Sequence, residues 1–166
     1  MSPQTVRQGA VQSHPASTAV VGLPANGETR VEMKRRNVLI VDTERDEGEL
    51  FARALEARRN CKCYLTAKDK EATTLMKDVP FDLLLVDASI AMAGDFSLLK
   101  RVRRDYPRLV MIVVAYFHQK ELVHRALEQG ASGHIVKPIK VDDFRNKIEA
   151  FFELAASRSS EVVDDR

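Results

Sequence analysis

Hydrophobic residues gather in five short runs along the chain, and each run is followed by a segment with helical spacing of its apolar residues. The central run, residues 81–87 (FDLLLVD), has five apolar residues out of seven, which is typical of a strand buried on both faces of a parallel sheet. The other runs cover residues 37–42 (NVLIVD), 61–66 (CKCYLT), 109–115 (LVMIVVA) and 134–136 (HIV). The run at 61–66 mixes polar and apolar residues, so we expect it at an edge of the sheet.

The segments after these runs carry apolar residues three and four positions apart, which predicts five amphipathic helices. The apolar positions are Leu50, Phe51, Ala54 and Leu55; Ala72, Leu75 and Met76; Leu98, Leu99 and Val102; Leu122, Val123, Ala126 and Leu127; and Val141, Phe144, Ile148 and Phe151. Asp46 and Glu49 have the spacing of a capping box, so the first helix is predicted to begin there and to end near Arg59. Residues 88–94 are predicted as a loop, and Gly130 as the C-terminal cap of the fourth helix. Strands alternating with helices predict right-handed crossovers and a three-layer α/β sandwich around a parallel sheet.

Neither end of the chain shows the apolar spacing of a strand or of a helix. Residues 1–35 are predicted as a disordered leader, residues 36–155 as one domain, and residues 156–166 as a disordered tail. The N-terminus has no apolar targeting segment, and the longest apolar runs are too short to span a bilayer. We therefore expect a cytoplasmic protein without membrane insertion.

Charge does not point to a ligand, because 26 Lys and Arg residues nearly balance 24 Asp and Glu residues. Nucleic acid is consequently not expected as a direct partner. The third helix has a basic side (Lys100, Arg101, Arg103 and Arg104), and a solvated face is favoured there over a binding patch. Cys61 and Cys63 lack the second pair that a zinc site needs, so we interpret them as reduced packing residues.

Three polar side chains lie at the carboxyl ends of predicted strands: Asp42, Asp87 and Lys137. The carboxyl ends of parallel strands meet at one edge of a sheet, where ligands bind, so we expect these side chains to converge. Two carboxylates held close together repel, and hard oxygen ligands at a partly open site suit Mg²⁺. A carboxylate is also a competent nucleophile toward phosphorus, and a lysine can contact phosphoryl oxygens. Two simpler interpretations stay open: Asp87 as a helix cap or turn residue, and Lys137 as its structural ion-pair partner.

Three separated motifs resemble those of receiver domains of two-component response regulators: VLIVDTE, FDLLLVD and ALEQGASGHIVKP. The resemblance covers roughly residues 36–154. It implies a flavodoxin-like, doubly wound sheet of five parallel strands in the order 2-1-3-4-5, with five helices and a cis peptide before Pro138.

The resemblance also assigns roles to single residues. It implies that Asp87 accepts a phosphoryl group and that Lys137 contacts that group. It places Mg²⁺ between Asp42, Asp87 and the backbone carbonyl of Ser89. It further implies a histidine kinase or phosphotransfer protein as phosphodonor, and a downstream protein that binds the fourth helix, fifth strand and fifth helix.

The sequence departs from the receiver pattern at several of these positions. Thr43 stands where the family has a second acidic residue, so Mg²⁺ affinity should fall unless Glu44 or water substitutes. Val114 replaces the Ser or Thr whose hydroxyl would hydrogen-bond the phosphoryl group, and His134 stands at the aromatic switch position. Ala91 replaces the usual proline after the phosphoacceptor.

Two functions follow as alternatives. The first is a stand-alone receiver that accepts a phosphoryl group on Asp87 and signals through protein contacts, with no enzymatic activity beyond its own phosphorylation and dephosphorylation. The second is a pseudo-receiver that keeps the fold as a phosphorylation-independent interaction module. The nucleophile and the lysine favour the first, whereas Thr43 and Val114 favour the second. A flavin carrier or an aspartate-nucleophile phosphatase is disfavoured, because no phosphate-binding loop or second aspartate follows the first strand.

Overall fold

A computed structural model describes residues 34–58 and 60–161. Five strands alternate with five helices: β1 (Arg36–Val41), α1 (Arg45–Glu56), β2 (Cys61–Thr66), α2 (Asp69–Asp78), β3 (Leu83–Asp87), α3 (Ala88–Asp105), β4 (Val110–Tyr116), α4 (Lys120–Glu128), β5 (Gly133–Lys137) and α5 (Val141–Glu161). The strands are all parallel and lie in the order β2-β1-β3-β4-β5. The expected flavodoxin-like architecture is confirmed, with β2 at the edge as its mixed composition predicted. The peptide bond between Lys137 and Pro138 is cis, as the resemblance implied.

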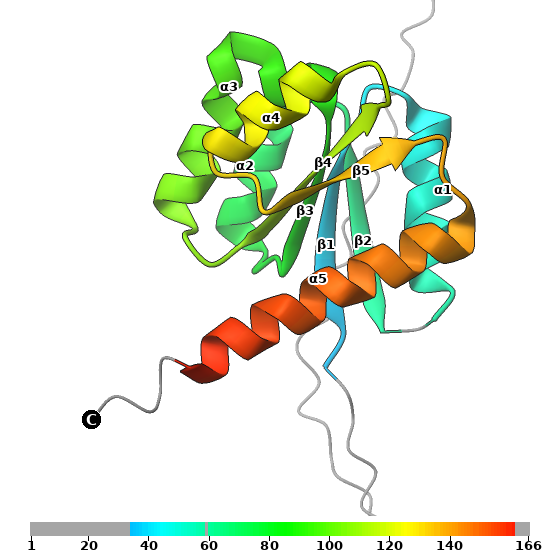
Figure 1. The fold of residues 1–166 in the computed structure, drawn as a ribbon. Coiled ribbons are helices and arrows are strands. Elements are labelled where there is room, and N and C mark those ends of the chain that lie inside the picture. Colours follow the sequence, from blue (N-terminus) through cyan, green and yellow to red (C-terminus); the bar gives the residue numbers. More distant parts are fainter. Residues whose placement is uncertain (1–33, 59, 162–166) are drawn as a thin grey trace, which may run out of the picture. The chain divides into compact units, whose positions relative to one another are not determined.

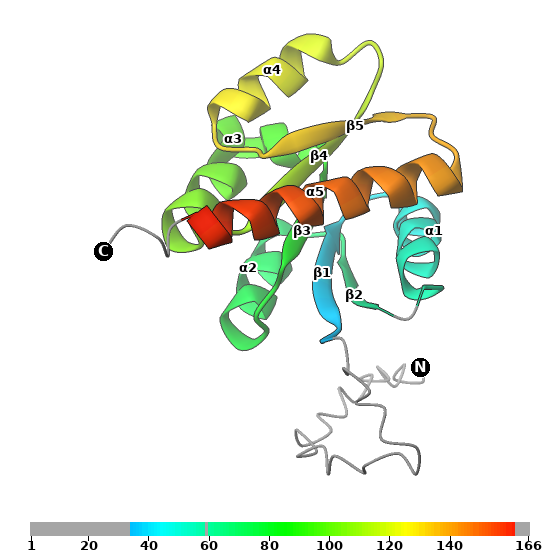
Figure 2. The same cartoon turned by 60° about the horizontal axis from the view of Figure 1, so that its bottom comes forward.

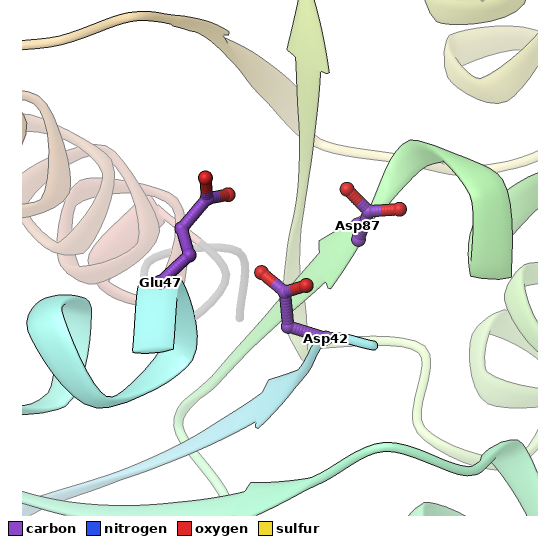
Figure 3. Close-up of side chains that lie close together, drawn as sticks. All are labelled: Asp42, Glu47 and Asp87. Carbon is purple, nitrogen blue, oxygen red and sulfur yellow. The ribbon is translucent and has the colours of Figure 1, made fainter. Parts of the chain in front are cut away.

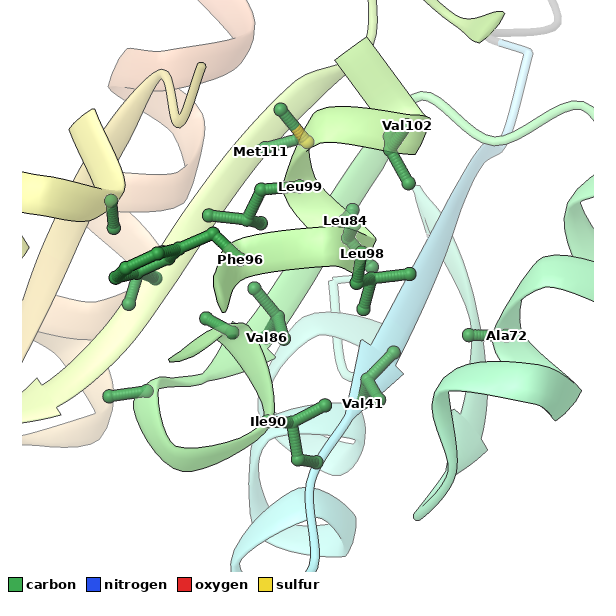
Figure 4. Close-up of a cluster of buried hydrophobic side chains, with 14 of the residues drawn as sticks. Val41, Ala72, Leu84, Val86, Ile90, Phe96, Leu98, Leu99, Val102 and Met111 are labelled. Carbon is green, nitrogen blue, oxygen red and sulfur yellow. The ribbon is translucent and has the colours of Figure 1, made fainter. Parts of the chain in front are cut away.

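Two hydrophobic clusters cover the two faces of this sheet. On one face, α2, α3 and α4 pack against residues such as Leu84, Val86 and Met111 (Figures 1 and 4). On the other face, α1 and α5 pack against residues such as Leu85 and Ile112 (Figure 2). Because successive residues of a strand point to opposite faces, the continuous apolar runs of the inner strands supply both clusters at once.

The strand register brings the polar ends of the strands to one edge of the sheet. Asp42 directly follows β1, Asp87 ends β3 and lies opposite Val114 of β4, and Lys137 ends β5 opposite Tyr116. The sheet therefore brings Asp42 and Lys137 to the same edge, although they are 95 positions apart in the sequence.

The first helix differs from the prediction at its start. It begins at Arg45, with Glu44 as N-cap and without a side-chain cap, so the predicted Asp46–Glu49 capping box is wrong. The Glu49 carboxylate instead pairs with Arg45 and Arg53 on the helix surface. Leu50, which was assigned to the buried face, is 52% exposed.

The predicted loop at residues 88–94 is also wrong in its first half. Helix α3 begins at Ala88, immediately after Asp87. Asp87 is the N-cap residue, and its carboxylate accepts a hydrogen bond from the Ser89 amide. The helix is then interrupted by non-helical residues at 93–96, of which Gly94, Asp95 and Phe96 have positive φ.

The basic side of α3 is not wholly solvated. Arg103 donates hydrogen bonds to the carbonyl oxygens of Gly130, Pro107 and Leu109 at 2.7–3.0 Å. Burial lowers the pKa of this guanidinium. Gly130 itself has φ of 108° just after α4, which confirms its predicted capping role.

The structure describes only part of the two segments that flank the predicted domain. Helix α5 continues to Glu161, so residues 156–161 of the predicted disordered tail are helical instead. No Gly or Pro interrupts residues 141–161, which explains why the helix does not stop where the hydrophobic stripe ends. The predicted leader lies outside the described residues up to position 33, as do residues 162–166.

The two cysteines are free and lie on β2, Cys61 buried and Cys63 half-buried. Burial raises the pKa of both thiols, that of Cys63 to about 12. The interpretation of both as reduced packing residues is consistent with these positions.

Candidate phosphoryl-acceptor site

Three carboxylates meet at the carboxyl edge of the sheet. Asp42 comes from the end of β1, Glu47 from the first turns of α1, and Asp87 from the end of β3 (Figure 3). Oxygen atoms of these three side chains all lie within 4.8 Å of one another. The predicted convergence of Asp42 and Asp87 is therefore present, with an additional acid that sequence reasoning did not identify.

Lys137 lies against this group. Its Nζ atom is 2.5 Å from Glu47 Oε1 and 3.3 Å from Asp87 Oδ1, and its side chain is only 5% exposed. Although burial by itself lowers the pKa of Lys137, the hydrogen bond and charge of Glu47, followed by those of Asp87, raise that pKa above its usual value. The lysine is thus held as an ammonium between two acids, and its stronger contact is with Glu47.

Asp87 is held from the other side by Ser89. The Ser89 amide donates to Asp87 Oδ2 at 2.9 Å, and the Ser89 hydroxyl donates to the same oxygen. The open interpretation of Asp87 as a helix cap is therefore correct. The role of the Ser89 carbonyl as a metal ligand stays a prediction.

Asp42 is the most buried of the three acids. The pKa of Asp42 is raised to about 6, chiefly by burial; the charges of Asp87 and Glu47 also raise it, whereas the hydrogen bond from the Glu44 amide and the charge of Lys137 lower it. The Glu44 amide donates to Asp42 Oδ1 at 2.8 Å. Near neutral pH this site carries more negative charge than one ammonium balances.

Glu44, predicted as a substitute for the missing second acid, is not part of the carboxylate group. Its side chain is exposed and only its amide contacts Asp42, whereas Glu47 provides the third carboxylate. Glu47 lies in the first turn of α1 together with the exposed residues Arg45 and Asp46. No local sequence pattern distinguishes it from these neighbours, so sequence reasoning had no signal for its role.

The predicted switch positions are Val114 and His134. Val114 is buried on β4 beside Asp87 and presents no hydroxyl to it. His134 lies on the exposed side of β5, where residues 134 and 136 alternate with the buried residues 133, 135 and 137. Thr43 is exposed next to Asp42.

The donor set fits a divalent cation. Three carboxylates provide the hard oxygen ligands that Mg²⁺ prefers, and their spacing allows one ion to contact oxygens from each. An ion at this place would also offset the excess negative charge.

The family model of the response regulator receiver domain matches residues 38–149, about two thirds of the chain. This chain belongs to the response regulator receiver family. Receiver domains are signalling modules that interact with histidine kinases or phosphotransfer proteins, and they bind Mg²⁺ at an acidic pocket of the kind described above. Asp42, Asp87 and Lys137 of this receiver lie at the corresponding edge of the sheet.

Two curated relatives illustrate the range of the family. The response regulator protein PilR from Pseudomonas aeruginosa is 27% identical over 135 residues, which are 81% of this chain and 30% of PilR. The sporulation initiation phosphotransferase F from Bacillus subtilis is 21% identical over 75% of this chain and 100% of its own length. The receiver spans 30% to 48% of the length of three curated relatives, among them PilR.

Solved structures agree with the fold. A CheY-like response regulator receiver domain protein from Methanospirillum hungatei superimposes with a TM-score of 0.68 at 22% identity, over 75% of this chain and 99% of that one. Within the described residues, none of the helices combines the length and hydrophobicity that a bilayer span requires.

Proposed function

We propose that this receiver accepts a phosphoryl group on Asp87, with Mg²⁺ held by Asp42, Glu47 and Asp87, and signals through protein contacts. The observation that carries the proposal is the meeting of a partly accessible Asp87, 14% exposed at its side chain, with Lys137 and two further acids. The match of a Bacillus subtilis phosphotransferase over its whole length supports phosphoryl transfer as the type of chemistry.

The transfer itself requires a nucleophile and charge compensation. One Asp87 oxygen forms the new bond to phosphorus, while the bond to the donor, such as the P–N bond of a phosphohistidine, breaks and its electron pair stays on the donor nitrogen. When bound, Mg²⁺ would neutralise the charge that develops on the phosphoryl oxygens. Lys137 supplies a second positive charge, since its Nζ atom is already 3.3 Å from Asp87.

The resting contacts of two residues must be given up for this chemistry. Ser89 has to release Asp87 Oδ2, and Lys137 has to loosen its contact with Glu47 to reach the incoming group. Glu47 then becomes free to contact the metal. The resting arrangement is therefore a partly neutralised form of the site, with the Lys137 ammonium offsetting one of the carboxylate charges.

A phosphorylation-independent pseudo-receiver remains the second candidate. Thr43 and Val114 favour it, because position 43 provides no acid next to Asp42 and position 114 provides no hydroxyl to Asp87. The capping of α3 by Asp87 also favours it, since the carboxylate then has a structural role.

Partner binding is proposed for the surface of α4, β5 and α5. Exposed apolar side chains on these three elements, Leu127, Val136 and Val141, support this assignment. Their exposure suits a protein partner better than solvent.

The proposal is tested by intact mass after incubation with a small acyl phosphate and Mg²⁺. We expect an increase of one phosphoryl group in the wild type and none in Asp87→Asn. Asp78→Asn, which changes an exposed aspartate at the end of α2, serves as the matched control and should be modified like the wild type. An unmodified wild type at saturating metal would support the pseudo-receiver instead.

A further inference from the structure

The ring of Tyr116 lies over the Lys137 ammonium. Lys137 Nζ is 4.4 Å from the centroid of the Tyr116 ring, within the range of a cation–π contact. The contact follows from the fold, because Tyr116 ends β4 directly opposite Lys137 of β5. Residues opposite each other on neighbouring strands project to the same side of the sheet. Lys137 is thus enclosed by two carboxylates and one aromatic ring.

Tyr116 belongs to an aromatic cluster at the surface, which also contains Phe117 and His118. The rings of Tyr116 and His118 stack with centroids 5.7 Å apart and planes 11° apart, and the rings of His118 and Phe117 meet edge to face at 5.5 Å. Phe117 is 67% exposed and Tyr116 is 38% exposed. A direct chain of contacts therefore runs from the buried ammonium to the surface of the β4–α4 loop.

The loop that carries the cluster is held in a defined turn. The Tyr116 amide donates to Gln119 Oε1 at 2.8 Å, and the Gln119 amide donates to the Tyr116 carbonyl at 2.9 Å. The same turn leads into α4, which begins at Lys120. A shift of the Tyr116 ring would therefore displace the residues that start this helix.

We propose that Tyr116 is a positioning residue, whose ring holds the Lys137 ammonium against the carboxylates and transmits its displacement to His118 and Phe117. Val114 offers no hydroxyl to an incoming group, and His134 points to solvent, so neither provides a contact between Asp87 and the surface. The Tyr116 ring touches the one cation that must move when Asp87 gains a phosphoryl group. The effect on phosphorylation rests on the proposed function, whereas the contact chain does not.

The first test measures the rate of Asp87 modification by a small acyl phosphate at varied donor concentration. Tyr116→Leu removes the ring and should lower the maximal rate constant roughly threefold to tenfold, with the half-saturating donor concentration little changed. Tyr116→Phe keeps the ring and should restore the wild-type rate. An unchanged rate in Tyr116→Leu, or an equal loss in Tyr116→Phe, would overturn the positioning role.

The second test needs no phosphodonor. Aromatic resonances of the isotopically labelled protein are compared between the wild type and Lys137→Met, and we expect shifts at Tyr116, His118 and Phe117. Lys62→Met is the matched control, because Lys62 Nζ lies 5.0 Å from the Tyr64 ring centroid on β2. This control should shift Tyr64 and leave the surface cluster unchanged.

The two tests separate the possible failures. If Lys137→Met does not fold, Glu47→Gln, which removes the charge of one partner of the ammonium, is measured in its place. If the wild type is never phosphorylated, the proposed function fails and the resonances alone decide whether Lys137 and the cluster are coupled. Unshifted His118 and Phe117 rings in a folded variant would refute the transmission.

Discussion

Three acids decide the electrostatics of this site, and two of them, Asp42 and Asp87, were predicted. Asp42 is buried, and Glu47 adds a third carboxylate close to the other two. Lys137 balances one of the charges, with Glu47 as its nearest partner. The site therefore stores electrostatic repulsion, which a divalent cation or a proton would relieve.

Removal of the Glu47 charge should weaken metal binding. We expect Glu47→Gln to lower Mg²⁺ affinity by roughly tenfold or more, because one of three charged ligands is lost. Glu44→Gln changes an exposed acid that contributes only its backbone amide, so its affinity should equal that of the wild type. Titration calorimetry of both variants decides between them, and equal losses would contradict the assignment of Glu47.

The raised pKa of Asp42 predicts a dependence of stability on pH. Since the folded protein holds this proton with a pKa of about 6 and the unfolded chain with 3.8, the folded state binds more protons between these values. The free energy of unfolding should therefore fall as pH rises from about 4 to 7, by about 3 kcal/mol at most. Asp42→Asn should lack this fall in metal-free urea titrations at pH 4.5 and 7.5. A wild type with the same pH response as Asp42→Asn would show that the carboxyl is not perturbed.

At the scale of elements, close contacts between strands and helices leave no room for a side chain at some positions, so glycine stands there. Gly133 begins β5, and a Cβ atom there would lie 2.4 Å from the Phe151 ring of α5. Gly48 of α1 is also close to a neighbour, since a Cβ atom would lie 2.5 Å from a terminal methyl carbon of Leu65. The two contacts differ because a leucine methyl can rotate away, whereas the Phe151 ring, which packs against the core, must shift as a whole.

Gly133→Ala should consequently destabilise the protein by roughly 1–3 kcal/mol. Gly48→Ala should be close to neutral or stabilising, because alanine favours the helix interior over glycine by about 1 kcal/mol. Urea unfolding of both variants provides the comparison. Recovery of stability in Gly133→Ala with Phe151→Leu would identify the ring as the cause, and a neutral Gly133→Ala would show that α5 moves freely.

The sequence was informative about strands and less so about helix starts. Buried parallel strands are nearly continuous apolar runs, so β1, β3 and β4 were predicted almost to the residue, together with Asp42 and Asp87 at their ends. The beginnings of α1 and α3 depend on how each helix is capped. The capping box predicted for α1 is absent, and Asp87 was considered as a cap without the helix that follows it being predicted. No local pattern marked Glu47. The carbonyl contacts of Arg103 come from three separate segments, which no local pattern reports.

On the scale of the whole molecule, the sheet separates two hydrophobic clusters that, among the described residues, share no side chain. Ile90 belongs to the cluster under α2, α3 and α4, and Ile148 to the cluster under α1 and α5. Both clusters draw on the same central strands, so loss of either should unfold the domain as one unit.

Substitutions in the two cores should act independently. We expect Ile90→Val and Ile148→Val each to lower the free energy of unfolding by about 1 kcal/mol, through the loss of one buried methylene. The double variant should show the sum within about 0.5 kcal/mol, because the sheet lies between the two sites. Urea denaturation of the three variants measures this, and a coupling above 1 kcal/mol would mean that the sheet transmits strain between its faces.

The position of Lys137 on the last strand has a consequence for synthesis. Asp42, Glu47 and Asp87 leave the ribosome well before Lys137, and domains generally begin to fold from the N-terminus as they emerge. A nascent chain that ends before β5 would hold three mutually repelling acids without their ammonium. We therefore expect its earlier strands to stay loosely associated until β5 is added and the Lys137 ammonium offsets the charge of the acids.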